Sequence, residues 1–291
     1  MHPAPSVIIF TALSGLGFGL MGWLGVGLPA VSGWSAFALF FVAYGLAVGG
    51  LVASTFHLGN PKRAIKAFSQ WRSSWLSREG ILAIVSLLVM AVYAIGLIFL
   101  NQRWQIVGWA GAVLSLGTVF TTSMIYAQMK TVPRWNTPLT PALFFLYALA
   151  GGALLAGQTS AAVLLLIVLS IVQVVAWTLG EESFSRAGHT IETATGLGNL
   201  GRVRLLESPH SSPNYLLKEM VYVVGRKHVD KLRVIAIFLM GLVPVAIIVL
   251  LPNNQFMAAA AVISHIIGLF ASRWLFFAQA EHVVGLYYGK R

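Results

Sequence analysis

Long runs of apolar residues alternate with short polar segments along this chain of 291 residues. A helix needs about 20 consecutive apolar residues to cross the roughly 30 Å hydrocarbon core of a bilayer. The continuous runs lack the dyad alternation of a membrane β-barrel, so we expect an all-α polytopic bundle of about eight transmembrane helices. The predicted spans cover about 6–28, 34–56, 81–101, 104–128, 141–157, 161–179, 233–251 and 256–277.

Three features of these runs leave room for another interpretation. The fifth and sixth runs are the shortest, so residues 157–160 either join two helices or interrupt a single broken pair. The first run could be taken for a signal peptide, but no basic region precedes it and it is too long, so we interpret it as a helix. Small residues recur along the first two runs, which favours close helix packing over a ligand groove. They are Gly15, Gly17, Gly19, Gly22, Gly25, Gly27, Gly45, Gly49 and Gly50.

Composition excludes a water-soluble globular protein. Hydrophobic residues make up 58% of the sequence and charged residues only 9%, whereas soluble domains carry about 25% charged residues. The chain has no cysteine, so it cannot form a disulfide or ligate an iron–sulfur cluster through thiolates. We therefore expect a single integral membrane domain over residues 1–291.

Basic residues lie almost entirely on one side of the predicted bundle. All but one of the 19 Lys and Arg residues fall in segments that the spans place on the same side, and the exception is Arg103. By the positive-inside rule, we expect both termini and the long loops to be cytoplasmic. The net charge of +11 then reflects contact with anionic headgroups rather than nucleic-acid binding.

Two segments on this side are long. In residues 57–80, Pro61 can begin a short helix, with Ile65 and Phe68 on a face that suits an interfacial position. The segment 180–232 contains six of the eight acidic residues. Its polarity favours a protein-docking surface, with a flexible connector as the alternative.

A histidine and a carboxylate come close to the membrane at consecutive span ends. His57 ends the second predicted span and Glu79 precedes the third, so both are expected at one depth. Such a pair can move the protons that quinone reduction requires, since histidine titrates near neutral pH. The structural alternative is that His57 caps a helix and that Glu79 pairs with a nearby arginine.

Two further ionisable residues fall in the last span. His265 lies near its middle, and no other histidine lies inside a span to serve as a second axial haem ligand. A hydrogen bond to a neighbouring helix is therefore its expected use, although an intramembrane histidine is also a functional candidate. Arg273 lies near the span end, where it either pairs with Glu281 or is solvated.

Several short strings resemble the membrane anchor subunit of the dimethyl sulfoxide reductase family. They are His57-Leu58-Gly59-Asn60-Pro61, Leu76-Ser77-Arg78-Glu79, Thr131-Val132-Pro133-Arg134-Trp135 and Thr140-Pro141. The strings at 195–198, 201–210, 214–216, 219–220 and 273–278 resemble, more narrowly, the anchor of cytoplasmic sulfite dehydrogenases. The long segment before the seventh span departs from the enterobacterial sulfoxide reductase anchor.

The resemblance implies a complex of three subunits. A molybdopterin subunit would carry the catalytic centre, and a ferredoxin-like subunit with four [4Fe–4S] clusters would carry electrons to this anchor. Quinone would be the exchangeable substrate, with no haem in the anchor. The positions of His57 and Glu79 match the family's quinone site, and possible further members are Arg63, Arg78, His265 and Arg273. Candidate docking residues in the segment 180–232 are Arg202, Arg204, Glu207 and His210.

We therefore expect a quinone-reactive anchor that receives electrons from sulfite oxidation. One alternative is a sulfoxide-type reductase anchor that takes electrons from quinol. Another is a passive anchor with quinone bound at a shared interface. A transporter is remote, because no matching pair of broken spans recurs in the two halves and the predicted mid-membrane region is nearly free of charge.

Overall fold

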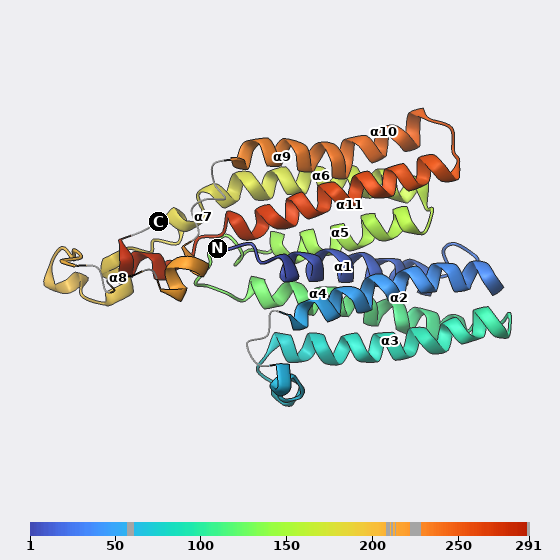
Figure 1. Ribbon diagram of the computed structural model, residues 1–291, viewed down its shortest axis with the longest axis horizontal. Helices are drawn as coiled ribbons and strands as arrows, with labels where there is room; N and C mark the ends of the chain where they lie inside the picture. The colour runs from blue at the N-terminus through green and yellow to red at the C-terminus, as the bar shows by residue number, and fades with distance from the viewer. Residues whose placement is uncertain (57–60, 208–209, 211, 213, 222–227, 290–291) are drawn as a thin grey trace.

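The protein is a bundle of long helices that run side by side (Figure 1). A computed structural model describes residues 1–56, 61–207, 210, 212, 214–221 and 228–289, and every regular element within them is helical. The all-α architecture expected from the apolar runs is confirmed. The long elements are α1 (Pro5–Gly25), α2 (Gly33–Thr55), α3 (Trp75–Phe99), α4 (Gln105–Ala127), α5 (Leu139–Leu155), α6 (Thr159–Glu181), α9 (Val229–Ile237), η5 (Phe238–Leu242), α10 (Val243–Leu250) and α11 (Gln255–Ala278).

Short elements gather at one end of the bundle, beside both termini of the protein (Figure 1). The Met1 ammonium donates a hydrogen bond to the Ala280 carbonyl at 2.6 Å, which joins the two terminal segments. We call the segments 61–74, 128–138, 182–221 and 279–289 the basic end; Arg103 lies in the loop between α3 and α4. The short elements are η1 (Pro61–Gln70), α7 (Ser183–Arg186), α8 (Ile191–Thr195), η2 (Gly198–Leu200), η3 (Leu216–Met220) and η6 (Val283–Tyr288).

Each predicted span overlaps a helix of the structure, with shifted ends. In the described residues, seven helical segments are long and apolar enough to cross a membrane, including Val229–Leu250 as one segment. The eighth, α5, has 17 residues, so a count of eight crossings stays a prediction. A turn at Gly157, with φ of +66°, separates α5 from α6, which are therefore two helices. The largest shift is in α3, which begins at Trp75 rather than at 81.

Helix α1 lies at the centre of the bundle. It packs against α2, α4, α5 and α11, and most of its residues are buried. Helices α2, α3 and α4 lie on one side of it, and α6, α9, α10 and α11 lie with α5 on the other (Figure 1). Two apolar clusters of buried side chains both include residues of α1, and the cluster with α2, α3 and α4 extends to Phe144 of α5 and Phe277 of α11.

Some of the small residues in α1 allow helices to touch at their backbones. A methyl group added to Gly19 would overlap the Ala148 carbonyl of α5, and one added to Gly152 would lie 2.5 Å from the Gly19 carbonyl carbon. Gly17 makes a similar approach to α2. By contrast, nothing lies within 4 Å of a methyl group added to Gly45. Close packing therefore explains part of the glycine pattern, not all of it.

Proline interrupts the helix that runs from Val229 to Leu250. Pro244 has no N–H group, so it cannot donate to the carbonyl four or five residues earlier. Those carbonyls belong to Met240 and Leu239, in the single π-helical turn η5. Lipid offers no hydrogen-bond donor to an orphaned carbonyl, so another part of the protein must supply one.

Helix α11 supplies both donors. Ser264 Oγ donates to the Leu239 carbonyl at 2.7 Å, and His265 Nδ1 donates to the Met240 carbonyl at 2.8 Å. The His265 side chain is buried, with 1% exposed. Its hydrogen bond between helices matches the use that its sequence context favours.

The backbone approach at Gly19 predicts a specific sensitivity to one added methyl group. Gly19→Ala should lower the free energy of unfolding by about 1–3 kcal/mol, because overpacking displaces α1 from α5. Thermal unfolding of the detergent-solubilised protein measures this effect. Gly45→Ala is the matched control and should leave the transition unchanged or slightly higher. Equal transitions for the two variants would contradict this account of the packing.

The role of Pro244 predicts a coupling between two helices. His265→Ala should lower the free energy of unfolding. This loss should be about 0.6–1.7 kcal/mol smaller when Pro244→Ala is also present, because the new N–H group can donate to a carbonyl of η5. Denaturant unfolding of the four variants of this cycle measures the coupling. Pro252→Ala, beyond the end of α10, is the control substitution. The explanation is wrong if His265→Ala lowers the free energy of unfolding equally in the wild type, in Pro244→Ala and in Pro252→Ala.

Candidate functional site

The site is built around a buried carboxyl group at the start of α3. The helix begins after Ser74, whose hydroxyl oxygen accepts from the Ser77 backbone N–H at 3.4 Å. Glu79 follows in the second turn and exposes 5% of its surface. All eight acidic residues are described, and Glu79 is the only one that is buried. An ionisable group buried within a membrane helix is a functional candidate by default.

Glu79 faces α4. The Thr122 hydroxyl donates to Glu79 Oε1 at 3.5 Å, which is a long and weak hydrogen bond. One turn further along α4, Tyr126 interacts electrostatically with the carboxyl group. Among the described residues, no cation forms an ion pair with Glu79, so the pairing that the sequence allowed as an alternative is absent from this part of the protein.

Arg78 is turned away from its neighbour in sequence. Its Nε donates to the Trp71 carbonyl at 2.9 Å and its Nη2 donates to the Arg72 carbonyl at 2.6 Å. Its guanidinium lies 4.3 Å from the centre of the Trp75 ring. Arg78 therefore joins residues 71–72, which follow η1, to α3. Because its guanidinium is used in this contact, Arg78 does not neutralise Glu79.

Two predicted members of the site cannot be placed. His57 follows the end of α2 but lies outside the described residues. Arg63 belongs to η1, and its side chain also lies outside the described part. The association of either residue with Glu79 stays a prediction.

Aromatic rings separate Glu79 from a buried cation on α11. The ring of Tyr126 contacts those of Trp135, Phe144, Phe276 and Phe277, with centroids 5.3–5.7 Å apart. Tyr126 also interacts electrostatically with Arg273. A carboxyl group and a guanidinium thus both act on one tyrosine.

Arg273 is deeply buried, contrary to both alternatives that the sequence suggested. It exposes 3% of its surface, and its guanidinium carbon lies 3.9 Å from the centre of the Phe144 ring and 4.6 Å from that of Tyr147. It forms no ion pair with Glu281 in the described structure. The reason is that Arg273 faces α5, five residues before α11 ends at Ala278.

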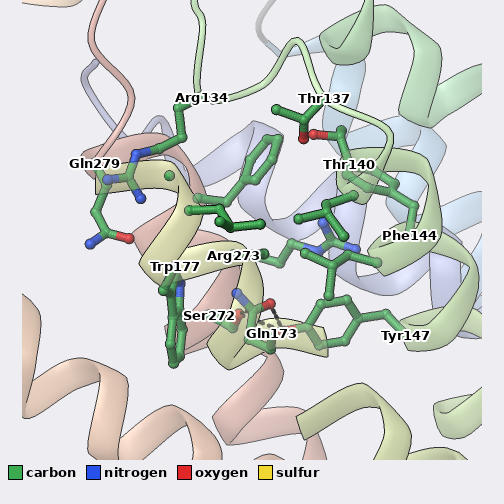
Figure 2. A pocket seen from close by; sticks show the side chains of 16 residues that line it. Arg134, Thr137, Thr140, Phe144, Tyr147, Gln173, Trp177, Ser272, Arg273 and Gln279 are labelled. Atoms are coloured by element: carbon green, nitrogen blue, oxygen red, sulfur yellow. Dashed lines mark hydrogen bonds between the residues drawn. The ribbon is translucent and has the colours of Figure 1, made fainter. Parts of the chain in front are cut away.

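A pocket adjoins this arginine between α5, α6 and α11 (Figure 2). Tyr147 donates to Gln173 Oε1 at 2.8 Å, and a short hydrogen bond joins the Tyr147 and Ser272 hydroxyls at 2.5 Å. Sequence reasoning missed Tyr147 and Gln173. The one available signal was a glutamine inside the apolar sixth run, and the partners of that glutamine come from two other helices.

His265 lies deeper along α11. Its Nε2 atom is buried without a hydrogen-bond partner, beside Gly151 of α5, where an added methyl group would come within 3.1 Å. Among the described residues, no group of three or more His, Cys, Asp or Glu side chains is placed to hold a metal ion. The geometry assigns His265 to the contact with η5.

The candidate docking residues are exposed at the basic end. Arg202, Arg204, Glu207 and His210 are all solvent-accessible. The His210 ring lies 5.9 Å from the ring of Tyr288 in η6, so this part of the segment contacts the C-terminal region. Nearby, Glu192 is also outside the bundle; a hydrogen bond from its own backbone N–H and another from Thr190 lower the pKa of its carboxyl group.

Comparison with known proteins agrees with the resemblance in the short strings. The sequence matches the family described as DMSO reductase anchor subunit (DmsC) over residues 5–278. It is 31% identical to the C subunit of sulfite dehydrogenase from Allochromatium vinosum, and the alignment spans 99% of each protein. It is 35% identical to the C subunit of anaerobic dimethyl sulfoxide reductase from Escherichia coli, over 36% of this sequence and 38% of that one.

No solved structure matches the protein. The family match nevertheless spans nearly all of the sequence, and the structure has the multiple apolar helices of a multi-pass membrane protein. The chain therefore belongs to the family of DMSO reductase membrane anchor subunits.

Proposed function

We propose that this protein is the quinone-reactive anchor of a sulfite dehydrogenase and that Glu79 delivers protons at its quinone site. The observation that carries the proposal is the burial of Glu79, the one buried carboxyl group of the protein, without a cationic partner among the described residues. A buried carboxylate that merely held the fold together would normally be paired. Thr122 and Tyr126 orient the group and bound its environment.

The proposed reaction balances across the complex. Oxidation of sulfite with water gives sulfate, two protons and two electrons at the molybdopterin subunit. A ferredoxin-like partner with four [4Fe–4S] clusters passes the two electrons to quinone, and two protons complete the quinol. The whole-length similarity to the C subunit of a sulfite dehydrogenase supports this assignment over a sulfoxide reductase.

The anchor contributes the protons and the place of contact. Glu79 lies near the start of α3, at the end of the bundle that carries both termini and η1 (Figure 1). Quinone would enter from lipid at that end, and His57 would serve the second carbonyl oxygen. The exposed segment around Arg202 and Glu207 is the proposed contact with the electron-carrying partner, on the cytoplasmic side of a bacterial inner membrane.

Removing the ionisable group at Glu79 tests the proton-transfer role. In the purified complex, Glu79→Gln should lower sulfite-dependent quinone reduction at least about tenfold, because general acid catalysis of this kind contributes factors of this size or larger. Sulfite oxidation with an artificial dye acceptor should continue, since it bypasses the anchor. Steady-state assays with both acceptors make the comparison.

Glu281→Gln, which removes a carboxylate at the same end without being in the proposed site, is the matched control and should leave both rates unchanged. His57→Ala should resemble Glu79→Gln. If both variants reduce quinone at the wild-type rate while the subunits stay assembled, the site assignment is wrong.

The proposed orientation can be determined with single cysteines, because the protein has none of its own. Leu206→Cys, at a position that is 89% exposed at the basic end, should react with a membrane-impermeant maleimide only in inside-out vesicles. Asn253→Cys, in the loop between α10 and α11, should react in intact spheroplasts. The reverse pattern would place the basic end in the periplasm and would exclude the proposed docking of a cytoplasmic partner.

A further inference from the structure

The pocket beside Arg273 is unlike the surroundings of Glu79, because its charged side chains are all basic. Its cavity volume is about 60 Å³, and it lies between α5, α6 and α11. Arg134 and Arg273 line it, and no acidic residue does. The other polar contributors include Thr137, Thr140 and Gln279 (Figure 2).

Arg273 has no anionic partner in the described structure. The side chain is 3% exposed, and its buried Nε atom has no hydrogen-bond partner. Phe144 and Tyr147 stack on the guanidinium, and such contacts offset part of the cost of removing a cation from water. They do not supply an acceptor for the N–H donors, and a buried charge with unmet donors is strongly destabilising.

Further cations surround the mouth of the pocket. A second hollow shares Thr137, Leu139 and Leu179 with the first, and its basic lining residues include Lys130 and Arg186. No acidic residue lines this hollow either. Arg186 is paired with Glu182 on the surface, but Lys130 adds positive charge. The electrostatic field along this path therefore favours an anion.

Gly180 of α6 leaves room for the side chain of Arg134 at the mouth of the pocket. A methyl group added to Gly180 would lie 2.8 Å from Arg134 Nη1, so the guanidinium rests against the bare backbone of the helix. Arg134 is thereby held over the pocket that Arg273 also lines (Figure 2). The two arginines thus contribute positive charge at two sides of the same pocket (Figure 2), which favours an anion there.

The walls of the pocket are apolar. Leu139, Leu143 and Ala176 line it together with Leu179, which exposes 44% of its surface on α6. Arg273 lies five residues before the end of α11 at Ala278, a rise of about 8 Å along the helix. This depth lies near the boundary between hydrocarbon and headgroups. An anion with hydrocarbon attached fits these walls better than a free ion does.

We propose that the pocket binds the phosphate group of an acidic phospholipid, with Arg273 as its ligand, Arg134 adding positive charge at the mouth, and the acyl tails against Leu139 and Leu179. The inference goes beyond the quinone chemistry proposed above and does not depend on it. A neutral quinone carbonyl would leave the positive charge of Arg273 uncompensated, whereas a phosphate supplies both the counter-charge and the acceptors.

Lipid binding by the purified full-length protein tests the proposal. After delipidation in uncharged detergent, the wild type should retain phosphatidylglycerol supplied in mixed micelles, as counted by native mass spectrometry. It should retain less phosphatidylcholine, because the choline cation cancels the phosphate charge and is repelled by the arginines. Arg273→Gln should weaken retention about tenfold or more, because charge-assisted hydrogen bonds are lost. Arg273→Lys should keep most of it by keeping the charge.

Arg202→Gln is the matched control, since it removes one positive charge from the exposed segment outside the bundle, and it should retain lipid as the wild type does. Arg134→Gln, at the mouth, provides a second test should Arg273→Gln fail to fold, and it should also weaken retention. Competition by millimolar inorganic phosphate would support recognition of the phosphate group. Binding of inorganic phosphate without retention of phosphatidylglycerol would identify a free anion as the occupant and overturn the proposal. The proposal would be overturned if the wild type retained the two lipids equally, or if both arginine variants retained phosphatidylglycerol as the wild type does. Recovery of quinone in place of phospholipid would also overturn it.

Discussion

Hydrogen bonds that lipid cannot supply determine how α11 packs against η5 within one half of this bundle. A helix within hydrocarbon must satisfy each backbone carbonyl from inside the protein. Pro244 lacks the N–H group that would serve the carbonyl of Leu239 or Met240, and α11 provides a donor to each carbonyl through Ser264 and His265. This exchange fixes α11 against η5, and it thereby sets the height of Arg273, two turns further along the same helix.

Two buried ionisable side chains, one on α3 and one on α11, take no part in that helix contact. Glu79 on α3 and Arg273 on α11 both act electrostatically on Tyr126 of α4, and neither forms an ion pair with a described residue. A direct pair would satisfy both groups but would leave neither available to a ligand. Both groups adjoin the aromatic cluster around Tyr126, and the Glu79 carboxyl and the Arg273 guanidinium do not pair with each other. One is the proposed proton donor to quinone, and the other is the proposed anchor for an anionic lipid.

Much of the architecture was predictable from local sequence. Each apolar run of sufficient length became a helix, because a continuous run has no other stable form in lipid. The ends of the helices were less predictable. Helix α3 begins at Trp75 because Ser74 caps it. A helix that extends beyond the hydrocarbon can also include polar residues, which a search for apolar runs leaves out. The candidate role of Glu79 was also accessible, as a carboxylate beside an apolar run is costly. The ion pair of Arg273 with Glu281 was a wrong alternative, because helical periodicity places a residue on a face without showing what that face meets.

By itself, the sequence determined that this is an all-helical membrane protein and predicted all but one of its basic residues on one side, since length, apolarity and charge act locally along the polypeptide. Only the tertiary structure decided which polar groups meet. Tyr147, Gln173 and Ser272 lie on three different helices, and no spacing between them in the sequence encodes their contact. The buried position of Arg273 likewise depends on how α11 is rotated against α5. That rotation follows from side-chain packing and from the carbonyls exposed by Pro244, which are properties of the assembled bundle.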